Sequence, residues 1–332
     1  MPGIWRRSFN AWLALLLGAT PAVARQLSAP PIVQAETERA PRIVTDEAGR
    51  RVVIPAEVHR IVSLSPDLTE TVYALGLEDR LVGDTSYCDT PPAAKTKPHV
   101  GGPSNPSLEA IVALRPDLVL ASETINWANT ADAIARLGIP VYTTNPHTVQ
   151  GMIDSFGRLA DLLGAPKQGS ALVADLNRRL QDVHGRLADV PPVRALFVVW
   201  LEPLITIGQN TFIADALRCA GAESIVRSSQ NWPQYNFEEV VRLQPDYIVM
   251  AGSHSGEDAR TLEDLRSRPA WKDLRAVREG HVAIISEEID RPAPGLIGVV
   301  EQLARQIHPA AFASNDPPSH GDEIARSAQC AR

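Results

Sequence analysis

Short apolar runs alternate with segments of helical periodicity along most of the chain. In the first half, strands are predicted at "RIVSLS", "LVGDTS", "DLVLAS" and "PVYTT", and helices from Pro66 to Gly76 and near Ala131 to Leu137. In the second half, "RALFVVW", "DYIVM" and "HVAIIS" predict strands, and a last helix is predicted near Gly295 to Ile307. Such alternation is typical of parallel sheets with right-handed helical crossovers. The pattern therefore predicts an α/β protein with two lobes.

A segment without strand signals separates the two halves, from Thr148 to Ala188. Pro166 suits the first turn of a helix, and apolar side chains follow at spacings of three and four residues: Leu172, Leu176, Leu180, Val183 and Leu187. At ~1.5 Å per residue, a helix from Pro166 to Ala188 would be about 35 Å long, enough to span both lobes. We therefore predict an N-terminal lobe at residues 42–148, linking helices with this backbone helix at 149–189, and a C-terminal lobe at 190–308.

One short unit occurs in both halves of the chain. "SLEAIVALRPDLVLAS" begins at Ser107, and "NFEEVVRLQPDYIVMAG" begins at Asn236. Each copy predicts a capped helix, a proline that ends it and a buried strand, and Asn236 with Glu239 fits a capping box. The copies lie much farther apart than a solenoid period of roughly 20 to 50 residues, so they indicate two similar lobes. They place Glu109 and Glu238 at equivalent positions.

Residues 1–24 have the features of a secretory signal peptide. Arg6 and Arg7 precede an apolar run from Ala11 to Leu17, and the small residues "AVA" predict cleavage after Ala24. The run is far shorter than the about 20 residues of a membrane span, and no cysteine lies nearby, so neither a membrane anchor nor a lipid anchor is expected. The mature protein is predicted to be free in the periplasm, with a flexible leader at 25–41 and a disordered tail at 309–332.

Length, charge and cysteine content limit the function classes. The 332 residues suffice for about two domains. The net charge of −7 gives no electrostatic basis for binding nucleic acid. The three cysteines, Cys88, Cys219 and Cys330, show no metal-binding or redox spacing, and we expect buried or free thiols rather than a bridge.

Sequence signals for an enzyme or a metal centre are weak. Ser63 and Ser65 in "SLSPDLTE" are candidates for the nucleophile of a secreted hydrolase, but the G-x-S-x-G elbow is missing and Pro66 indicates a helix start. The chain has no GxxxxGK[ST] or HExxH string. The eight histidines are dispersed; His99 and His147 could reach a cleft between the two lobes, but no histidine-rich loop is present. We expect no catalytic residues, no direct metal site and no resident cofactor.

Several stretches, taken in order, resemble the substrate-binding proteins of ABC importers with a rigid helical backbone, the group that captures cobalamin, ferric siderophores and haem. The stretches are "RIVSLSPDLTETVYALG", "SYCDTPP", "SLEAIVALRPDLVLAS", "NWPQYNFEEVVRLQPDYIV", "RPAWKDLRAVREGHVAII" and "RPAPGLIGVVEQLA", within residues 42–308. The cobalamin-binding members are the most similar. The resemblance implies two lobes with central, mostly parallel sheets joined by one long helix, a small-molecule ligand between the lobes, and delivery to a permease with its ATPase subunits by a monomeric protein.

The resemblance also gives the repeated glutamates a role. In this family an acidic residue on each lobe docks onto arginines of the membrane permease, and the matching residues are Glu109 and Glu238. The alternative is that each acid only complements the dipole of its helix, an effect worth about 0.3 to 1 kcal/mol. That alternative explains either glutamate alone, but it explains the matched pair less well.

Ligand contacts are expected in loops that follow the carboxyl ends of strands. Tyr87 and Trp232 match aromatic binding positions of the cobalamin-binding members, Trp200 ends a predicted strand, and Trp127 lies near a position where the resemblance implies tryptophan. Flat rings suit a large, partly apolar ligand such as a corrin, and Arg291 is a candidate for a polar contact. The alternatives are ordinary packing for the aromatic residues and solvation for the arginine.

The class of ligand stays open at this level. A corrinoid fits the aromatic residues, and a ferric siderophore or haem is the alternative within the same group. Arg291 would suit an anionic siderophore, and Tyr87 could serve as an iron ligand for haem. A zinc or manganese receptor would need several His and carboxylate ligands in one place.

Overall fold

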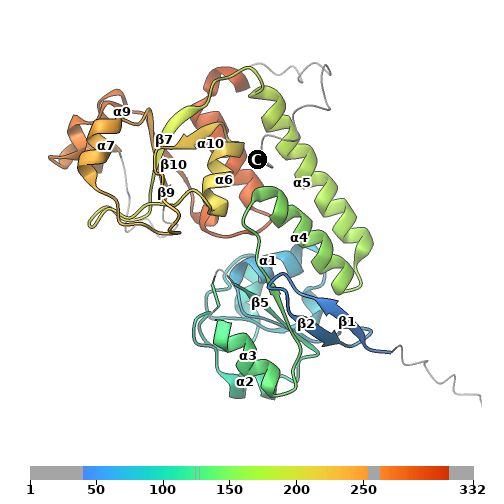
Figure 1. Cartoon of the computed structure of the whole chain (residues 1–332). Helices are drawn as coiled ribbons and strands as arrows, with labels where there is room; N and C mark the ends of the chain where they lie inside the picture. The colour runs from blue at the N-terminus through green and yellow to red at the C-terminus, as the bar shows by residue number, and fades with distance from the viewer. Residues whose placement is uncertain (1–39, 124, 127, 253–261, 314–332) are drawn as a thin grey trace, which may run out of the picture. The chain divides into compact units, whose positions relative to one another are not determined.

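The N-terminal lobe is built on a parallel sheet with a hairpin beside it. The computed structural model describes residues 40–123, 125–126, 128–252 and 262–313 (Figure 1). The sheet has the order β4-β3-β5-β6, with bounds Leu81–Gly83, Ile61–Ser63, Leu118–Ser122 and Val141–Thr144. Strands β1 (Arg42–Thr45) and β2 (Arg51–Ile54) form an antiparallel hairpin.

Helices α1 (Pro66–Ala74), α2 (Leu108–Ala113) and α3 (Ala128–Arg136) connect these strands. Pro66 occupies the first turn of α1, which suits its fixed φ and missing N–H. Gly76 ends this helix with a φ of 66°, a conformation that glycine adopts without steric cost. The helix predicted from Pro66 to Gly76 is therefore confirmed.

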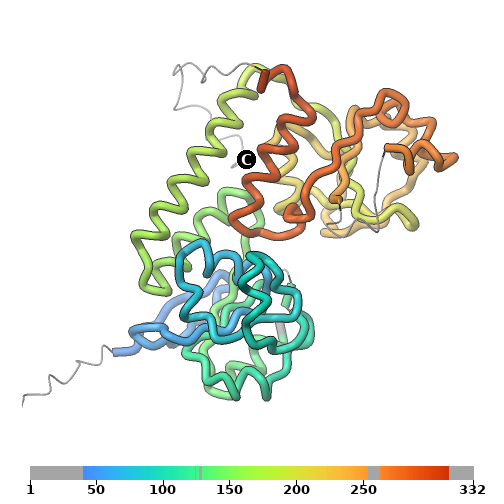
Figure 2. Tube along the Cα trace, turned by 180° about the vertical axis from the view of Figure 1, so that it is seen from behind, coloured from blue at the N-terminus to red at the C-terminus, as the bar shows by residue number. Residues whose placement is uncertain are grey.

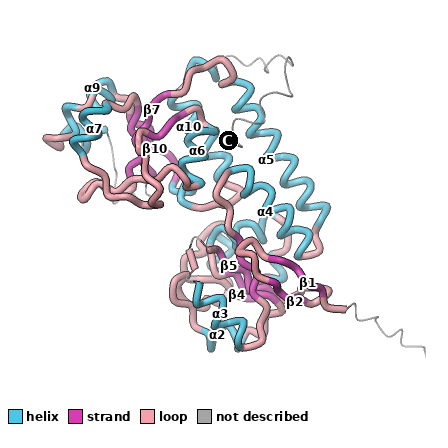
Figure 3. The backbone as a smooth tube through the Cα atoms, viewed as in Figure 1, coloured by secondary structure: helices cyan, strands magenta, loops and turns pink. Residues whose placement is uncertain are grey.

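The C-terminal lobe repeats this plan. Its parallel sheet has the order β10-β9-β7-β8, with bounds Val282–Ser286, Tyr247–Gly252, Val193–Val198 and Ala222–Ser224 (Figure 3). Its helices are α6 (Phe212–Cys219), α7 (Phe237–Leu243), α8 (Leu262–Ser267), α9 (Arg275–Glu279) and α10 (Leu296–Ile307). Both sheets are parallel and are connected by helices, so the predicted α/β class with two lobes is confirmed.

Two helices, α4 (Val149–Leu162) and α5 (Pro166–Arg186), link the lobes and lie side by side (Figures 1 and 2). With 21 residues at ~1.5 Å each, α5 is about 32 Å long. Met152 and Phe156 of α4 lie in the core of the C-terminal lobe, whereas Leu159 of the same helix lies in the core of the N-terminal lobe. Leu172 of α5 contacts both cores. The long backbone helix is thus present, and α4 reinforces it.

Two expectations from the sequence are wrong. Cys219 is disulfide-bonded, whereas Cys88 is a free and buried thiol. The tail predicted to be disordered from residue 309 is ordered at its start, because Pro309–Phe312 forms a short 3-10 helix, η5. Phe312 packs against the core of the C-terminal lobe, with the guanidinium groups of Arg186 and Arg305 each 5.5 Å from its ring centre. The partly buried ring of Phe312 therefore contributes apolar contacts that favour this turn.

Some predictions fall outside the described residues. These are the signal peptide and its cleavage after Ala24, most of the leader, Trp127, Cys330 and residues 314–332. Within the part of the chain that the structure describes, no helix is both long enough and apolar enough to cross a membrane.

Candidate ligand-binding face and docking helices

The carboxyl ends of the two sheets meet at Arg291. This residue follows η4 (Glu287–Asp290), which itself follows strand β10 of the C-terminal lobe. Its Nη1 lies 3.1 Å from Oε1 of Glu70 in α1, which follows β3, and 3.7 Å from Oδ1 of Asp89, which follows β4. We call the loops at these strand ends, in both lobes, the interlobe face. Ligands of open α/β sheets bind at such carboxyl ends.

Arg291 is held among carboxylates. Its side chain is 15% exposed, and its Nη2 also lies 3.8 Å from Glu287 of η4. Glu70 is only 8% exposed, so it is a buried acid and not a surface residue. Its burial depends on packing between the lobes, which no local pattern of residues can show. The spacing of Asp67 and Glu70 shows only that both acids lie on one side of α1.

The buried acids on α1 bind protons more strongly than usual. Burial raises the pKa of Asp67 to about 6, although a hydrogen bond from the hydroxyl of Ser65 opposes the shift. Burial raises the pKa of Glu70 to about 7, with the charge of Arg291 opposing it and the neighbouring carboxylates adding to it. Near neutral pH, Asp67 and Glu70 are therefore close to the pH at which each gains or loses its proton, and this would change the charge of the interlobe face.

Three aromatic side chains are exposed on loops of this face. Tyr87 is 67% exposed, Trp200 53% and Trp232 51%. Tyr87 lies between β4 and Asp89, and Trp200 follows β7. The loop of Trp232 is hydrogen-bonded to the segment after Trp200, since the backbone N–H of Thr206 donates to the carbonyl of Pro233 at 3.1 Å. The structure thus brings Trp200 and Trp232 into neighbouring loops. By contrast, Trp271 is buried and packs on Phe237, with ring centres 4.9 Å apart.

The repeated units form α2 with β5 and α7 with β9. Ser107 caps α2 by accepting a hydrogen bond from the N–H of Ala110 at 3.2 Å. Asn236 caps α7 by accepting from the N–H of Glu238 at 2.9 Å. The predicted capping box does not form, because the side chain of Glu239 accepts from the guanidinium of Arg242 instead.

Glu109 and Glu238 are both exposed near the starts of these helices. Among the described residues, none forms an ion pair with either carboxylate, although Glu239 next to Glu238 is paired with Arg242. Each lobe therefore presents one unpaired negative charge at an equivalent place. Such a charge is available to a partner without first breaking an internal contact.

An arginine fixes the carboxyl end of each of these helices in the same way, and we call this arrangement the arginine clamp. Behind α2, the guanidinium of Arg60 donates to the carbonyl of Leu114 at 2.6 Å, and the N–H of Arg60 donates to Asp117 at 2.9 Å. Behind α7, Arg194 donates to the carbonyl of Leu243 at 2.9 Å, and its N–H donates to Asp246 at 3.0 Å.

The residues before the two prolines, Arg115 and Gln244, both have positive φ, at 47° and 44°. A residue before proline is pushed out of the right-handed helical region, which explains why both helices end there.

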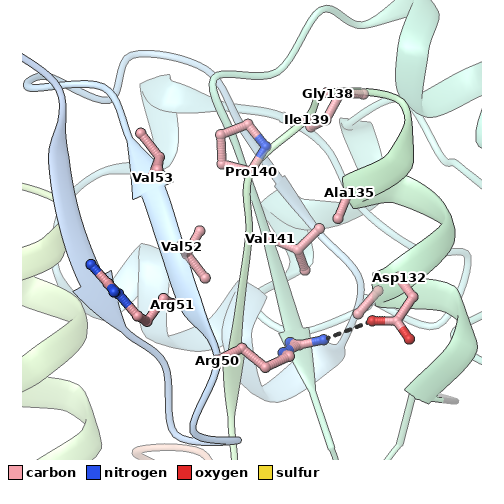
Figure 4. Close-up of a pocket in the computed structure, with 11 residues that line it drawn as sticks. Arg50, Arg51, Val52, Val53, Asp132, Ala135, Gly138, Ile139, Pro140 and Val141 are labelled. Atoms are coloured by element: carbon pink, nitrogen blue, oxygen red, sulfur yellow. Dashed lines mark ion pairs between the residues drawn. The ribbon is translucent and has the colours of Figure 1, made fainter.

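Other features of the described residues do not form a site. A surface hollow lies between β2 and the connection from α3 to β6, and Arg50 there points toward Asp132 at 3.6 Å (Figure 4). Arg50 also pairs with Asp46, so it has no free charge to offer. His99 pairs with Asp84 at 2.8 Å. Within the described ranges, no group of three or more His, Cys, Asp or Glu residues is placed to hold a metal ion.

Two parallel sheets that meet at their carboxyl ends and are joined by long helices define a class of protein, the two-lobed substrate-binding components of ABC importers. Residues 61–289 match the family described as periplasmic binding protein. The chain belongs to this family. It is a binding protein and not an enzyme, and it works with a permease and its ATPase.

Named relatives support the same class. The chain is 32% identical over 323 residues to an uncharacterized ABC transporter substrate-binding lipoprotein, YvrC of Bacillus subtilis, with 92% of this chain and 99% of the relative covered. It is 29% identical to the vitamin B12-binding protein of Yersinia pestis, with 77% and 89% covered. A periplasmic binding protein and a lipoprotein both agree with a location outside the cytoplasm.

Solved structures show the same fold. The vitamin B12-binding protein BtuF of Vibrio cholerae superposes with a TM-score of 0.67 at 27% identity, covering 77% of this chain and 99% of that one. The heme-binding protein BhuT, solved with two hemes, superposes with a TM-score of 0.69 at 26% identity, covering 76% and 98%. The family and its importer role are therefore established, whereas these relatives bind different ligands.

Proposed function

We propose that this protein captures a corrinoid such as cobalamin between its lobes and delivers it to an ABC permease. The observation that carries the proposal is the set of three exposed rings, Tyr87, Trp200 and Trp232, on loops at the carboxyl ends of the sheets. Exposed aromatic rings at such a place offer large flat areas to a macrocycle at a low cost in conformational entropy. The similarity to vitamin B12-binding proteins supports the same ligand class.

The charges on the interlobe face favour a ligand without strong negative charge. Arg291, the cation assigned to this face from the sequence, already contacts Glu70, Asp89 and Glu287. Cyanocobalamin carries mainly amide side chains, whose N–H groups can donate hydrogen bonds to carboxylates. The propionates of haem and an anionic ferric siderophore would instead meet like charges on this face.

Glu109 and Glu238 are proposed as the two contacts to the permease. Both carboxylates are exposed and unpaired, and each stands on a helix fixed from behind by an arginine clamp. An unpaired carboxylate on a fixed helix suits pairing with an arginine of a partner. Only the glutamate side chain itself then loses conformational freedom on binding. Trp127 remains a proposed ligand contact from the sequence alone.

The test of the ligand is calorimetric titration of the purified protein with cyanocobalamin. We expect saturable binding at one site. Replacing Trp232 by alanine should weaken binding by about 1 to 3 kcal/mol, the range of a buried aromatic contact. Trp232→Phe, which keeps a flat ring, should recover much of that loss.

Leu137→Ala provides the matched control for this titration. Leu137 is 52% exposed at the end of α3, outside the interlobe face, and its loss should leave affinity unchanged. Haemin and ferrichrome are titrated in parallel. Absence of any heat with cyanocobalamin at ~0.1 mM, together with saturable binding of haemin or ferrichrome, would assign the other ligand class to this face.

A further inference from the structure

The outer surfaces of α2 and α7 share a second residue besides the glutamate. Val112 is 46% exposed and Val241 is 41% exposed, and they occupy equivalent positions in the two copies of the repeat. The remaining exposed position differs between the helices, since Ala113 stands in α2 where Arg242 stands in α7. Glutamate and valine are therefore what the two exposed helix surfaces have in common.

The valines are not misplaced core residues. The preceding residues, Ile111 and Val240, have no exposed surface and supply the packing of each helix on its lobe. Val112 follows Glu109 by three positions, and Val241 follows Glu238 by three, a spacing that puts the two side chains on one side of a helix. Each lobe thus exposes an apolar isopropyl group beside an unpaired carboxylate.

We propose that each docking surface is a carboxylate–valine pair, in which the valine packs against apolar side chains of the permease next to the arginine that pairs with Glu109 or Glu238. The proposal rests on the docking role of these glutamates given above. The partner is thus a permease surface on which a cation borders an apolar area, once for each lobe.

The physical advantage of the pair is exclusion of water. An ion pair between exposed groups contributes only about 0 to 1 kcal/mol, because water screens it. Apolar groups that surround such a contact remove water and lower the local dielectric constant, so the same pair becomes stronger. Arg242 does not compete for Glu238, since it is bound to Glu239 at 3.0 Å through its Nε.

The experiment measures binding of the protein to its permease–ATPase complex in lipid nanodiscs, without any cargo. Val112→Thr and Val241→Thr keep the shape and β-branching of valine and add a hydroxyl group. Each should weaken the complex about 3- to 10-fold. The double variant should lose roughly the product of the two factors, since the sites are far apart.

Val53→Thr is the matched control. Val53 is 58% exposed on β2, outside both docking helices, so the same chemical change there should leave the dissociation constant unaltered. Thermal unfolding of each variant checks the fold, and Val112→Ala with Val241→Ala provides a second pair should threonine disturb the helices. The slope of affinity against salt should stay as in the wild type, because no charge is removed.

Glu109→Arg and Glu238→Arg in the same assay separate the two proposals. Loss of binding in the glutamate variants, with all valine variants binding as tightly as the wild type, would overturn the carboxylate–valine pair and leave docking by the glutamates standing. Normal binding of both sets would overturn both. Cargo does not enter the measurement, so a mistaken ligand class would not affect the result.

Discussion

Asp67 and Glu70 show how a two-lobed fold changes the chemistry of single residues. On an isolated α1, both carboxyl groups would face water and ionise at their ordinary pKa values. In the structure they are 2% and 8% exposed, and Arg291 from the opposite lobe approaches Glu70. Desolvation exceeds the attraction of that single cation, so the pKa values of both acids rise.

The pH dependence of stability should reveal the buried state of Asp67. Its pKa rises from 3.8 to about 6 on folding, so the folded protein keeps this proton to higher pH than the unfolded chain does. The free energy of unfolding contributed by Asp67 is therefore largest below the ordinary pKa and declines as pH rises toward 6. We expect Asp67→Asn, which cannot ionise, to lack this decline.

Urea unfolding of both proteins between about pH 4 and 7 measures the effect. The difference in unfolding free energy, wild type minus Asp67→Asn, should fall by roughly 1 to 3 kcal/mol over that range. Both proteins must share the same buffer and ionic strength, because other carboxyl groups contribute equally to each curve. Parallel curves would mean that Asp67 ionises as an exposed carboxyl group does.

Helices α2 and α7 are short, with six and seven residues, and would not be stable alone. Each is fixed at both ends, by a side-chain cap at its start and by an arginine that binds its last carbonyl groups. Asp246 takes part in the second clamp. Desolvation alone would raise its pKa, but hydrogen bonds from Arg194 and the nearby guanidinium charges outweigh that effect and lower it. Asp246 therefore stays ionised, and able to accept these hydrogen bonds, to lower pH than an ordinary aspartate would.

Reversing the charge of both glutamates separates cargo capture from delivery. The variant Glu109→Arg with Glu238→Arg should bind cargo as the wild type does, because neither residue lies on the interlobe face. Uptake should fall sharply, since two like charges at a buried contact can cost roughly 2 to 5 kcal/mol each. Cargo uptake in the native host and calorimetry on the purified variant measure the two effects.

Charge exchange supplies the control for the double variant. Permease variants in which arginines are changed to glutamate should restore part of the uptake, a result that helix-dipole effects cannot produce. Normal cargo affinity together with normal uptake in the double variant would show that both glutamates serve only their own helices.

Local signals in the sequence were sufficient to predict most of the elements. Pro66 and Gly76 bound α1, the leucine stripe identifies α5, and the repeated unit predicts α2 and α7 with their caps. These features depend on neighbours within a few residues, so the chain itself carries the information. The exposed positions of Glu109 and Glu238 follow from the same helical periodicity.

Features that depend on distant parts of the chain were not predicted. Glu70 is buried by contacts from the other lobe, and Arg291 is occupied for the same reason. The disulfide of Cys219 requires a second cysteine with its Cα within about 7 Å, a condition that spacing in the sequence does not show. Phe312 is held by Arg186 and Arg305, which are contributed by two different helices.

The lobes are joined by helices that belong to both cores. Side chains of α4 lie in each of them, and the N–H of Val149 at its start donates to the buried Asp215 of α6 at 2.7 Å. Arg179 of α5 donates to both carboxylate oxygens of Glu301 in α10, at 2.8 and 2.9 Å. Rotation of one lobe against the other would break these contacts. Flexible connecting strands would allow the same rotation without breaking any such contact.

Small-angle scattering can test this rigidity. The radius of gyration with saturating cyanocobalamin should differ from that of the free protein by less than about 1 Å, since pre-organised complexes move little on binding. A second comparison uses protein purified with its cargo from the native host and the same protein after the cargo is removed. Their radii of gyration should also agree within about 1 Å. A contraction of several ångströms would show that the connection bends in spite of its contacts.

Chemical modification of the Cys88 thiol can report local opening of the N-terminal lobe. The thiol is 2% exposed, lies 3.2 Å from the hydroxyl oxygens of both Thr69 and Thr85, and has a pKa raised by burial. A thiol reagent attacks the thiolate, so modification of Cys88 has to wait until the N-terminal lobe opens locally. Cargo that binds the closed form makes such openings rarer in proportion to its occupancy. The rate of thiol modification would therefore measure cargo binding even for a molecule that has no colour and releases no heat.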